Sequence, residues 1–318
     1  MKGRVRILAF ISFLIGSVVF IWVVKRAGPL DLLARLRALG WGFLLVLAIS
    51  SIRYIVQTLA WRRCLPAEQQ IRLGALFRAR LAGEALGDLT VGPVVADPVR
   101  LVALGGDLSL SSGIASLTVV NVVYGVSSCV LVVTGCIALL ASFALSESLR
   151  STVLLSIVIA TALIGTCVLA VSRRWRLVSA ALSACSRFSK SIASKAQAVR
   201  DIEEYVYDFF ARRPGDFLFV AVCETIFHLA GIAEIYVAMS LTGSHVSLPT
   251  AFIFESVNRA INIAFVFVPA LIGVDEAATG LLTDVLGLGA TAGVALAIVR
   301  KLRMFFWIGV GLSFLARA

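Results

Sequence analysis

Charge is scarce in this chain. Of its 318 residues, 15% are Asp, Glu, Lys or Arg and 60% are hydrophobic, and the mean hydropathy is +0.99. There are only two histidines, and the six cysteines show no CxxC spacing, so we expect no redox role, no metal site and no cofactor. The sequence also lacks a nucleophile elbow, a phosphate-cradling glycine loop and an HExxH zinc motif. These absences argue against the common classes of soluble enzyme.

Apolar runs near the ~20 residues that cross a bilayer recur along the chain. The expected spans cover residues 7–24, 41–61, 112–141, 152–171, 217–241 and 288–314. Trp41 and Trp61 bracket the second span, where their indoles would suit the two membrane interfaces. The only sizeable hydrophilic stretch is 173–213, which leaves no room for a separate soluble catalytic domain. The sequence therefore predicts an all-α polytopic membrane protein with one membrane domain, 1–318.

Two further segments, 71–110 and 249–286, make poor ordinary spans. Each carries charges, then a proline, then a short apolar piece with an acidic residue, and Pro93 and Pro269 lie 176 positions apart. The same shift superposes the spans on either side of each proline. We interpret 41–171 as repeat 1 and 217–318 as repeat 2, with 1–40 as a first span and loop. The alternative is two unrelated helices that each precede a proline.

Lys and Arg in the short loops predict the orientation. They gather before the first span, after the second, and between Arg173 and Arg213, which places both termini in the cytoplasm if each odd segment enters and leaves by the same face. Counting crossings then makes the repeats point opposite ways, as an inverted repeat of about six transmembrane helices plus two re-entrant broken-helix hairpins. The basic residues between 25 and 37 disagree with this orientation.

The net charge of +11 indicates a negatively charged partner. The basic residues lie near span ends and inside spans rather than on one soluble face, so anionic lipid fits better than nucleic acid. We expect residues 172–216 to form a cytoplasmic basic amphipathic connector on the lipid surface. A connector surrounded by solvent would have the same composition.

Polar residues recur at helical spacing in both odd segments. Two stripes share one helix face each: Arg80, Glu84 and Asp88, and Glu255, Arg259 and Asn262. Such stripes either pair internally and hold helices together or line one polar cavity. The second interpretation is favoured because a charged residue in the middle of a bilayer costs roughly 3 kcal/mol.

The last span carries three basic residues well inside it, Arg300, Lys301 and Arg303. A planar guanidinium pairs well with phosphate, so Arg300 and Arg303 are candidate headgroup ligands. The alternative is pairing with Asp275 or Glu276.

Glu224 and His228 lie one turn apart in the span 217–241. A Glu and a His at this spacing predict either a proton relay or a hydrogen-bonded structural pair. One helix with these two groups does not supply a set of metal ligands.

Residues 83–100, GEALGDLTVGPVVADPVR, resemble the motif of the lysylphosphatidylglycerol synthase transmembrane region, a family also described as flippase-like membrane proteins. The matching residues are Gly83, Glu84, Ala85, Leu86, Thr90, Pro98 and Arg100, with Asp97 in place of the family's glutamate. A second signature, VPALIGVDEAATGLL, matches at Pro269, Gly273, Val274 and Glu276. The departures are Gly87, Val91, Val95 and Ala96.

This resemblance extends over roughly 41–317 and implies a lipid-translocating membrane part without the soluble aminoacyl-transfer domain of the two-part synthases. Some stand-alone relatives are associated with hopanoid synthesis and others with glycolipid pathways. Asp97, Arg100, Asp275 and Glu276 complete the candidate lipid-binding set.

The sequence thus predicts a flippase or scramblase for a phospholipid or other polar lipid in the bacterial inner membrane, and no enzyme. Two alternatives stay open. One is a membrane-embedded enzyme acting on a lipid-linked substrate, and the other is a non-catalytic partner of a lipid synthase. A homo-oligomer is open as well.

Overall fold

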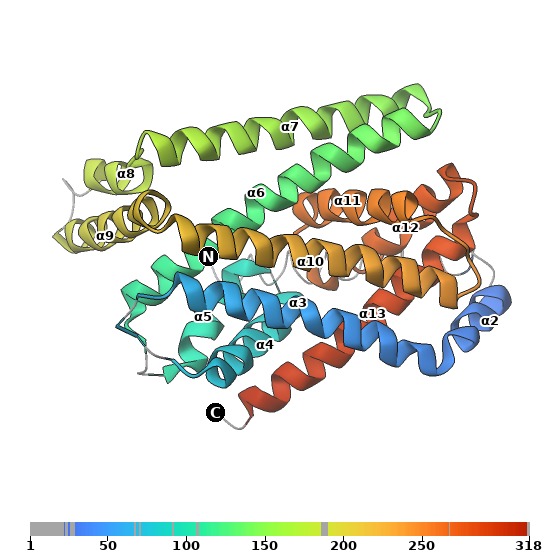
Figure 1. The fold of residues 1–318 in the computed structure, drawn as a ribbon, viewed down its shortest axis with the longest axis horizontal. Coiled ribbons are helices and arrows are strands. Elements are labelled where there is room, and N and C mark those ends of the chain that lie inside the picture. Colours follow the sequence, from blue (N-terminus) through green and yellow to red (C-terminus); the bar gives the residue numbers. More distant parts are fainter. Residues whose placement is uncertain are drawn as a thin grey trace.

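A computed structural model describes Trp22, Lys25 and residues 29–66, 68–69, 71–90, 92–105, 108–185, 190–266 and 268–316. All regular secondary structure within these ranges is helical (Figure 1). The helices are α2 (Pro29–Leu39), η1 (Gly40–Gly42), α3 (Phe43–Cys64), α4 (Leu73–Leu89), α5 (Pro93–Ala103), α6 (Leu110–Ser142), α7 (Glu147–Ser172), α8 (Leu177–Cys185), α9 (Lys190–Arg212), α10 (Pro214–Leu241), α11 (Leu248–Ala264), η4 (Pro269–Leu271), α12 (Val274–Val285) and α13 (Ala290–Leu315). The span predicted at 7–24 lies outside the described residues, apart from Trp22.

Four stretches of the described chain are long and apolar enough to cross a membrane. They are Leu30–Cys64, α6, α7 and α10, and the four predicted spans between 41 and 241 fall on them. The chain is therefore an integral membrane protein. Helix α13, with 26 residues, is about 39 Å long, but it carries Arg300, Lys301 and Arg303 near its middle.

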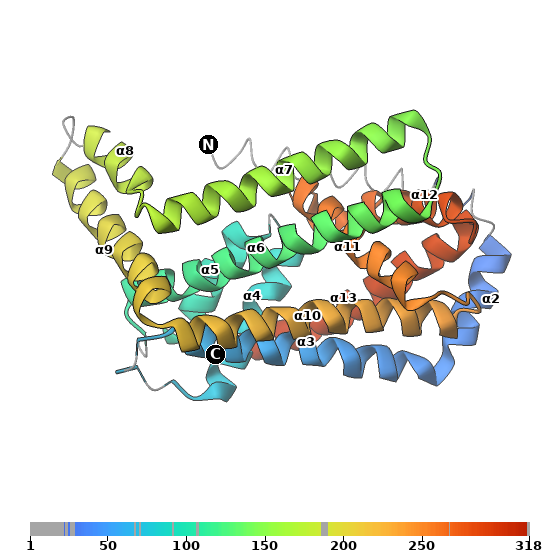
Figure 2. The same cartoon turned by 45° about the horizontal axis from the view of Figure 1, so that its top comes forward.

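The long helices form layers. Helix α3 lies alongside α10, and α6 crosses them (Figures 1 and 2). Helix α7 packs on α6 and presents Leu155 and Val158 to the outside, with 58% and 64% of each exposed. Side chains of this kind are suited to lipid hydrocarbon, which explains why a helix with so few protein neighbours is stable.

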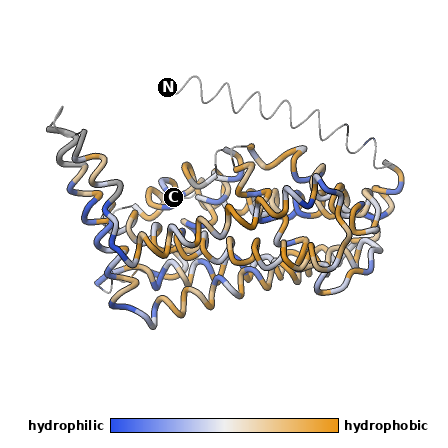
Figure 3. Tube along the Cα trace, turned by 90° about the horizontal axis from the view of Figure 1, so that it is seen from above, coloured by the Kyte–Doolittle hydropathy of each residue, from blue (hydrophilic) through white to orange (hydrophobic). Residues whose placement is uncertain are grey.

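The connector predicted at 172–216 forms two helices, α8 and α9, that pack on each other and project from one end of the molecule (Figure 2). Hydrophilic residues gather on this projection, whereas the helices of the body are mainly hydrophobic (Figure 3). Val206 and Phe209 of α9 are buried in the core, so the end of this connector is anchored on the membrane domain.

Both odd segments fold as two helices separated by a break. In the first, α4 ends at Leu89 and α5 begins at Pro93, where proline is favoured because the first helical N–H needs no partner. Gly92 before it has a φ of +52°, a value that favours glycine. Helices α4 and α5 of the first segment pack on each other. In the second segment, α12 packs mainly on α13, the helix that follows the segment. The break in the second segment spans the residues between Ala264 and Val274.

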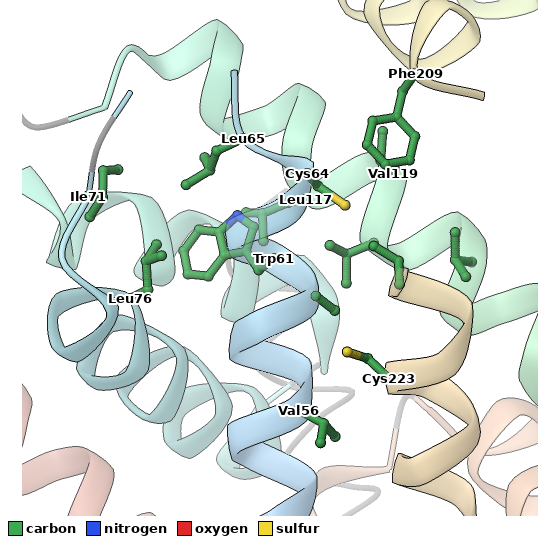
Figure 4. Packing of buried hydrophobic residues seen from close by; sticks show 14 of the residues in the cluster. Val56, Trp61, Cys64, Leu65, Ile71, Leu76, Leu117, Val119, Phe209 and Cys223 are labelled. Carbon is green, nitrogen blue, oxygen red and sulfur yellow. The ribbon is translucent and has the colours of Figure 1, made fainter. Parts of the chain in front are cut away.

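The prediction that Trp61 lies at a membrane interface is wrong. Its side chain is fully buried, and its indole Nε1 donates to Ser116 Oγ at 3.1 Å. Leu65, Ile71 and Leu76 pack around the ring (Figure 4), because the chain turns back after α3 and covers this end. Trp41, in contrast, is 87% exposed.

Close packing of α13 on α12 predicts a strict size limit at Gly293. A Cβ at this position would overlap the Thr279 carbonyl oxygen, whereas a Cβ at Gly309 of the same helix meets nothing within 4 Å. We expect Gly293→Ala to lower the free energy of unfolding by about 1–3 kcal/mol through overpacking. Gly309→Ala should leave it unchanged or raise it by up to about 1 kcal/mol. Thermal unfolding in detergent micelles measures both, and a stable Gly293→Ala protein would contradict this packing.

Candidate functional site

A polar cavity of about 590 Å³ lies among eight helices, α3 to α6 and α10 to α13. Both predicted stripes line it: Arg80, Glu84 and Asp88 from α4, and Glu255, Arg259 and Asn262 from α11. The basic lining residues are Arg53, Arg80, Arg100, Arg259, Arg300, Lys301 and Arg303, and the acidic ones are Glu84, Asp88, Glu234, Glu255 and Asp275. The cavity therefore combines both signs of charge inside a mainly apolar helical body.

Glu234 of α10 joins three helices on one side of the cavity. Arg303 Nη1 of α13 donates to Glu234 Oε1 at 2.7 Å, and Arg53 Nη1 of α3 donates to Glu234 Oε2 at 3.4 Å. The Glu234 side chain is only 3% exposed. Since an unpaired buried carboxylate would be costly, the two guanidiniums stabilise it and fix the distance between the helices.

Asp275 and Glu276 hold the two other basic residues of α13. Arg300 Nη2 contacts Asp275 Oδ1 and donates to Thr279 Oγ1 at 2.7 Å. Lys301 Nζ lies 3.7 Å from Asp275 Oδ2 and 3.5 Å from Glu276 Oε1. Glu276 Oε2 also accepts a hydrogen bond of 2.7 Å from the Gly273 amide, which caps the start of α12.

The motif residues of the first segment meet in one contact between α4 and α5. Arg100 donates to Glu84 at 2.8 Å and to Asp97 at 2.6 Å, and Asn121 Nδ2 of α6 donates to Asp97 at 2.7 Å. A Cβ at Gly83 would lie 2.6 Å from the Ala96 carbonyl oxygen, so glycine is needed for this approach. Gly83, Glu84, Asp97 and Arg100 are thus explained together by one packed ion-pair cluster.

The stripe of α11 pairs internally and also reaches α6. Arg259 donates to Glu255 Oε1 through Nε at 2.9 Å and Nη2 at 2.6 Å. Its Nη1 donates to the Tyr124 hydroxyl of α6 at 3.0 Å. Phe227 of α10 lies under two guanidiniums, with the Cζ atoms of Arg53 and Arg259 at 4.3 and 5.0 Å from the ring centroid, close enough for cation–π attraction.

Arg80 differs from the other lining arginines. It is 5% exposed, and within the described residues it forms no ion pair. One of its nitrogens contacts Gln57 Oε1, whereas Nε and Nη1 have no hydrogen-bond partner. Gln57 Nε2 in turn reaches Glu224 Oε2 at 3.5 Å, so a neutral amide separates the guanidinium from the fully buried carboxylate.

Glu224 and His228 bond to different helices. Glu224 contacts Gln57 of α3, and the His228 Nε2 atom lies 3.1 Å from Ser127 Oγ of α6. Glu224 Oε1 and His228 Nδ1 have no hydrogen-bond partner in the described part of the chain. Neither residue lines the polar cavity, so these two residues lie behind its wall.

The backbone at the tip of the second segment is strained beside the cavity. Ala270 and Leu271 have φ values of 52° and 49°, a left-handed conformation that costs non-glycine residues roughly 1–2 kcal/mol each. Lys301 Nζ donates to the Leu271 carbonyl oxygen at 3.2 Å. Both residues line the cavity, so the lysine stabilises this shape at the cavity edge.

Several lining residues are absent from the predicted site. Arg53, Tyr54 and Gln57 of α3 contribute to the wall, as do Asn121 and Tyr124 of α6. Arg53 and Gln57 are four residues apart in an apolar span, the same spacing that marked the two predicted stripes. No grouping of three or more His, Cys, Asp or Glu suitable for a metal ion occurs among the residues that the structure describes.

One family model matches this chain, that of the lysylphosphatidylglycerol synthase TM region, over residues 9–312. No curated protein matches, and no solved structure matches. The family model covers both broken segments and every residue that lines the cavity.

The position of Glu234 between two guanidiniums predicts a large effect of Glu234→Gln on stability. Removing one partner of a buried ion pair typically costs about 3–5 kcal/mol because the other charge is left uncompensated. We therefore expect a marked fall in the unfolding temperature in detergent. The double variant Glu234→Gln/Arg303→Gln should recover part of the loss. Glu147→Gln, at an exposed site on α7, is the control and should change stability by no more than about 0.5 kcal/mol. Equal effects of Glu234→Gln and Glu147→Gln would contradict the pairing.

Proposed function

We propose that this chain, which belongs to the lysylphosphatidylglycerol synthase TM region family, moves a polar or anionic lipid between the two leaflets of the bacterial inner membrane. Membership of that family makes it a membrane protein of lipid metabolism or transport. A cavity with charged walls, enclosed by apolar helices, supports the more specific function because it offers a polar lipid headgroup a path through hydrocarbon. In this proposal the protein is a transporter, and it has no catalytic residue.

The observation that carries the proposal is the buried guanidinium of Arg80. The other arginines of the cavity have carboxylates within ion-pair distance, whereas Arg80 contacts a glutamine and has two nitrogens without a hydrogen-bond partner in the described residues. A buried charge without a counter-ion is costly, and a guanidinium matches phosphate in charge and in geometry. We infer that a headgroup phosphate is the missing partner of Arg80.

Arg300 and Arg303 contribute in a secondary way in this proposal. Asp275 and Glu234 fix their positions, yet Arg300 Nη1 and Arg303 Nε have no hydrogen-bond partner in the part of the chain that the structure describes. Both atoms are buried, so in this proposal they contact a headgroup that has been attracted to Arg80 only after the side chains around them move.

For the membrane topology we propose six spans and two re-entrant hairpins in an inverted repeat, with both termini in the cytoplasm. Two observations support it. The breaks of both segments line the same cavity. Thr90 and Gly92 belong to the first segment, and Val268 and Ala270 belong to the second. A Cβ at Gly92 would lie 3.1 Å from Val266 Cγ2, so the two breaks approach each other closely, as re-entrant hairpins from opposite faces would.

Arg80→Gln tests the proposed function. In proteoliposomes containing a fluorescent phosphatidylglycerol, an impermeant quencher reports the rate at which the lipid changes leaflets. We expect Arg80→Gln to slow this rate about 10- to 100-fold, since a hydrogen bond to a charged group is worth about 1.5–3 kcal/mol. Arg80→Lys keeps the charge but loses the planar guanidinium group, so its translocation rate should lie between the rates of the wild type and Arg80→Gln.

Arg78→Gln is the matched control, because Arg78 lies on the same helix and is exposed. It should translocate the probe at the wild-type rate. The unfolding temperatures of all variants are measured in parallel, and Arg80→Gln should remain within a few degrees of wild type because it breaks no ion pair of the described structure. A wild-type rate in Arg80→Gln would overturn the headgroup assignment.

Single cysteines in a Cys-less background test the topology. Gly74→Cys and Ser111→Cys flank the first broken segment, and His245→Cys and Asp284→Cys flank the second, all at exposed positions. An impermeant maleimide should label the first pair only from the cytoplasm and the second pair only from the periplasm. Labelling from opposite sides within either pair would rule out re-entrant hairpins.

A further inference from the structure

A second, apolar groove of about 650 Å³ lies between α6, α7 and α10. Phe210 of α9 and Phe217 of α10 also line it, with ring centroids 5.5 Å apart. Its wall includes Val130, Val168 and Leu229, which are 46%, 55% and 57% exposed. In a membrane protein a concave apolar surface of this kind is suited to hydrocarbon, such as a lipid acyl chain.

The groove and the polar cavity share a wall. On α6, Asn121 and Tyr124 face the cavity, whereas Val122 and Ser127 face the groove. Helix α10 is divided in the same way: Phe227 and Gly231 line the cavity, and His228, Leu229 and Ile232 line the groove. At these residues the packing of α6 on α10 therefore separates the two spaces.

Three rings form this wall where the helices meet. Tyr124 lies 5.7 Å from Phe227 and 6.3 Å from His228, measured between ring centroids, and Phe227 lies 5.3 Å from His228. Ser127 and His228 bond to each other on the groove side, and Tyr124 accepts a hydrogen bond from Arg259 on the cavity side. In this layer Tyr124 and Phe227 line the cavity, and His228 lines the groove.

We propose that the groove holds an acyl chain of the lipid whose headgroup enters the polar cavity, and that this chain passes the Tyr124–Phe227–His228 layer. The inference rests on the proposed function. A headgroup held at Arg80 leaves its chains in hydrocarbon, because apolar surface does not remain in a charged cavity. This layer has the charged cavity on one side and the apolar groove on the other. A lipid could therefore place its headgroup in the cavity and an acyl chain in the groove. Rotation of Tyr124 and Phe227 would open the passage.

Photo-crosslinking tests the inference on the full chain in vesicles. The probe is a phosphatidylglycerol with a diazirine in the middle of one acyl chain. We expect adducts on the groove-lining residues of α6 and α10. Ala221→Trp fills the groove and should reduce these adducts to background, whereas Val222→Trp is the matched control, because Val222 is the next residue, 48% exposed and outside the groove. Equal adducts in both variants would mean ordinary boundary lipid and would overturn the inference.

Val168→Trp on α7 provides a second obstruction in case Ala221→Trp fails to fold. Val168 lines the groove on a helix that packs mainly on α6, and Leu163→Trp on the same helix is its control. Adducts that survive Val168→Trp would also overturn the inference.

Arg80→Gln separates the inference from the proposed function. If one lipid occupies both spaces, Arg80→Gln lowers translocation and the groove adducts together. Slow translocation in Arg80→Gln with unchanged groove adducts would overturn the groove inference and leave the proposed function standing. A third outcome is possible, in which Ala221→Trp loses the groove adducts and translocates slowly while Arg80→Gln translocates at the wild-type rate. That outcome would support the groove and overturn the headgroup site.

Discussion

Charge pairing between helices is the interaction on which the polar cavity depends. Glu234 holds α3, α10 and α13 together through Arg53 and Arg303, and Asp275 holds α12 to α13 through Arg300. Without these carboxylates the buried guanidiniums would repel one another in an environment that screens charge less than bulk water does. These ion pairs stabilise polar cavity walls in a protein whose outer surface is suited to lipid. Among the lining arginines of the described structure, Arg80 is the one without an ion-pair partner.

Much of the architecture follows from the sequence. The apolar runs predicted α3, α6, α7 and α10 because a helix that crosses hydrocarbon must be apolar over about 20 residues, and the prolines marked both breaks. Burial of Trp61 was not predictable, since it depends on Leu65, Ile71 and Leu76 folding back over α3. Hydropathy identifies a tryptophan near a span end but contains no information on what covers it.

Spacings of four and three residues likewise predicted which faces of α4 and α11 are polar, and both faces line the cavity. The partners of individual charges could not be read in the same way. Arg303 pairs with Glu234, 69 residues away, although Asp275 and Glu276 were equally suitable partners by composition. Partner choice depends on helix crossing and on small residues such as Gly83, where α5 approaches α4 closely. Sequence patterns therefore predict polar faces better than they predict contacts between them.

The strained tip at Ala270 and Leu271 gives Lys301 a mechanical importance. Its ammonium lies near Asp275 and Glu276 and also holds the Leu271 carbonyl oxygen. An anion that drew the ammonium toward itself would release that oxygen, and the two residues would relax toward a backbone conformation of lower energy. Lys301 therefore links the charges of the cavity to the backbone shape of the chain between α11 and α12.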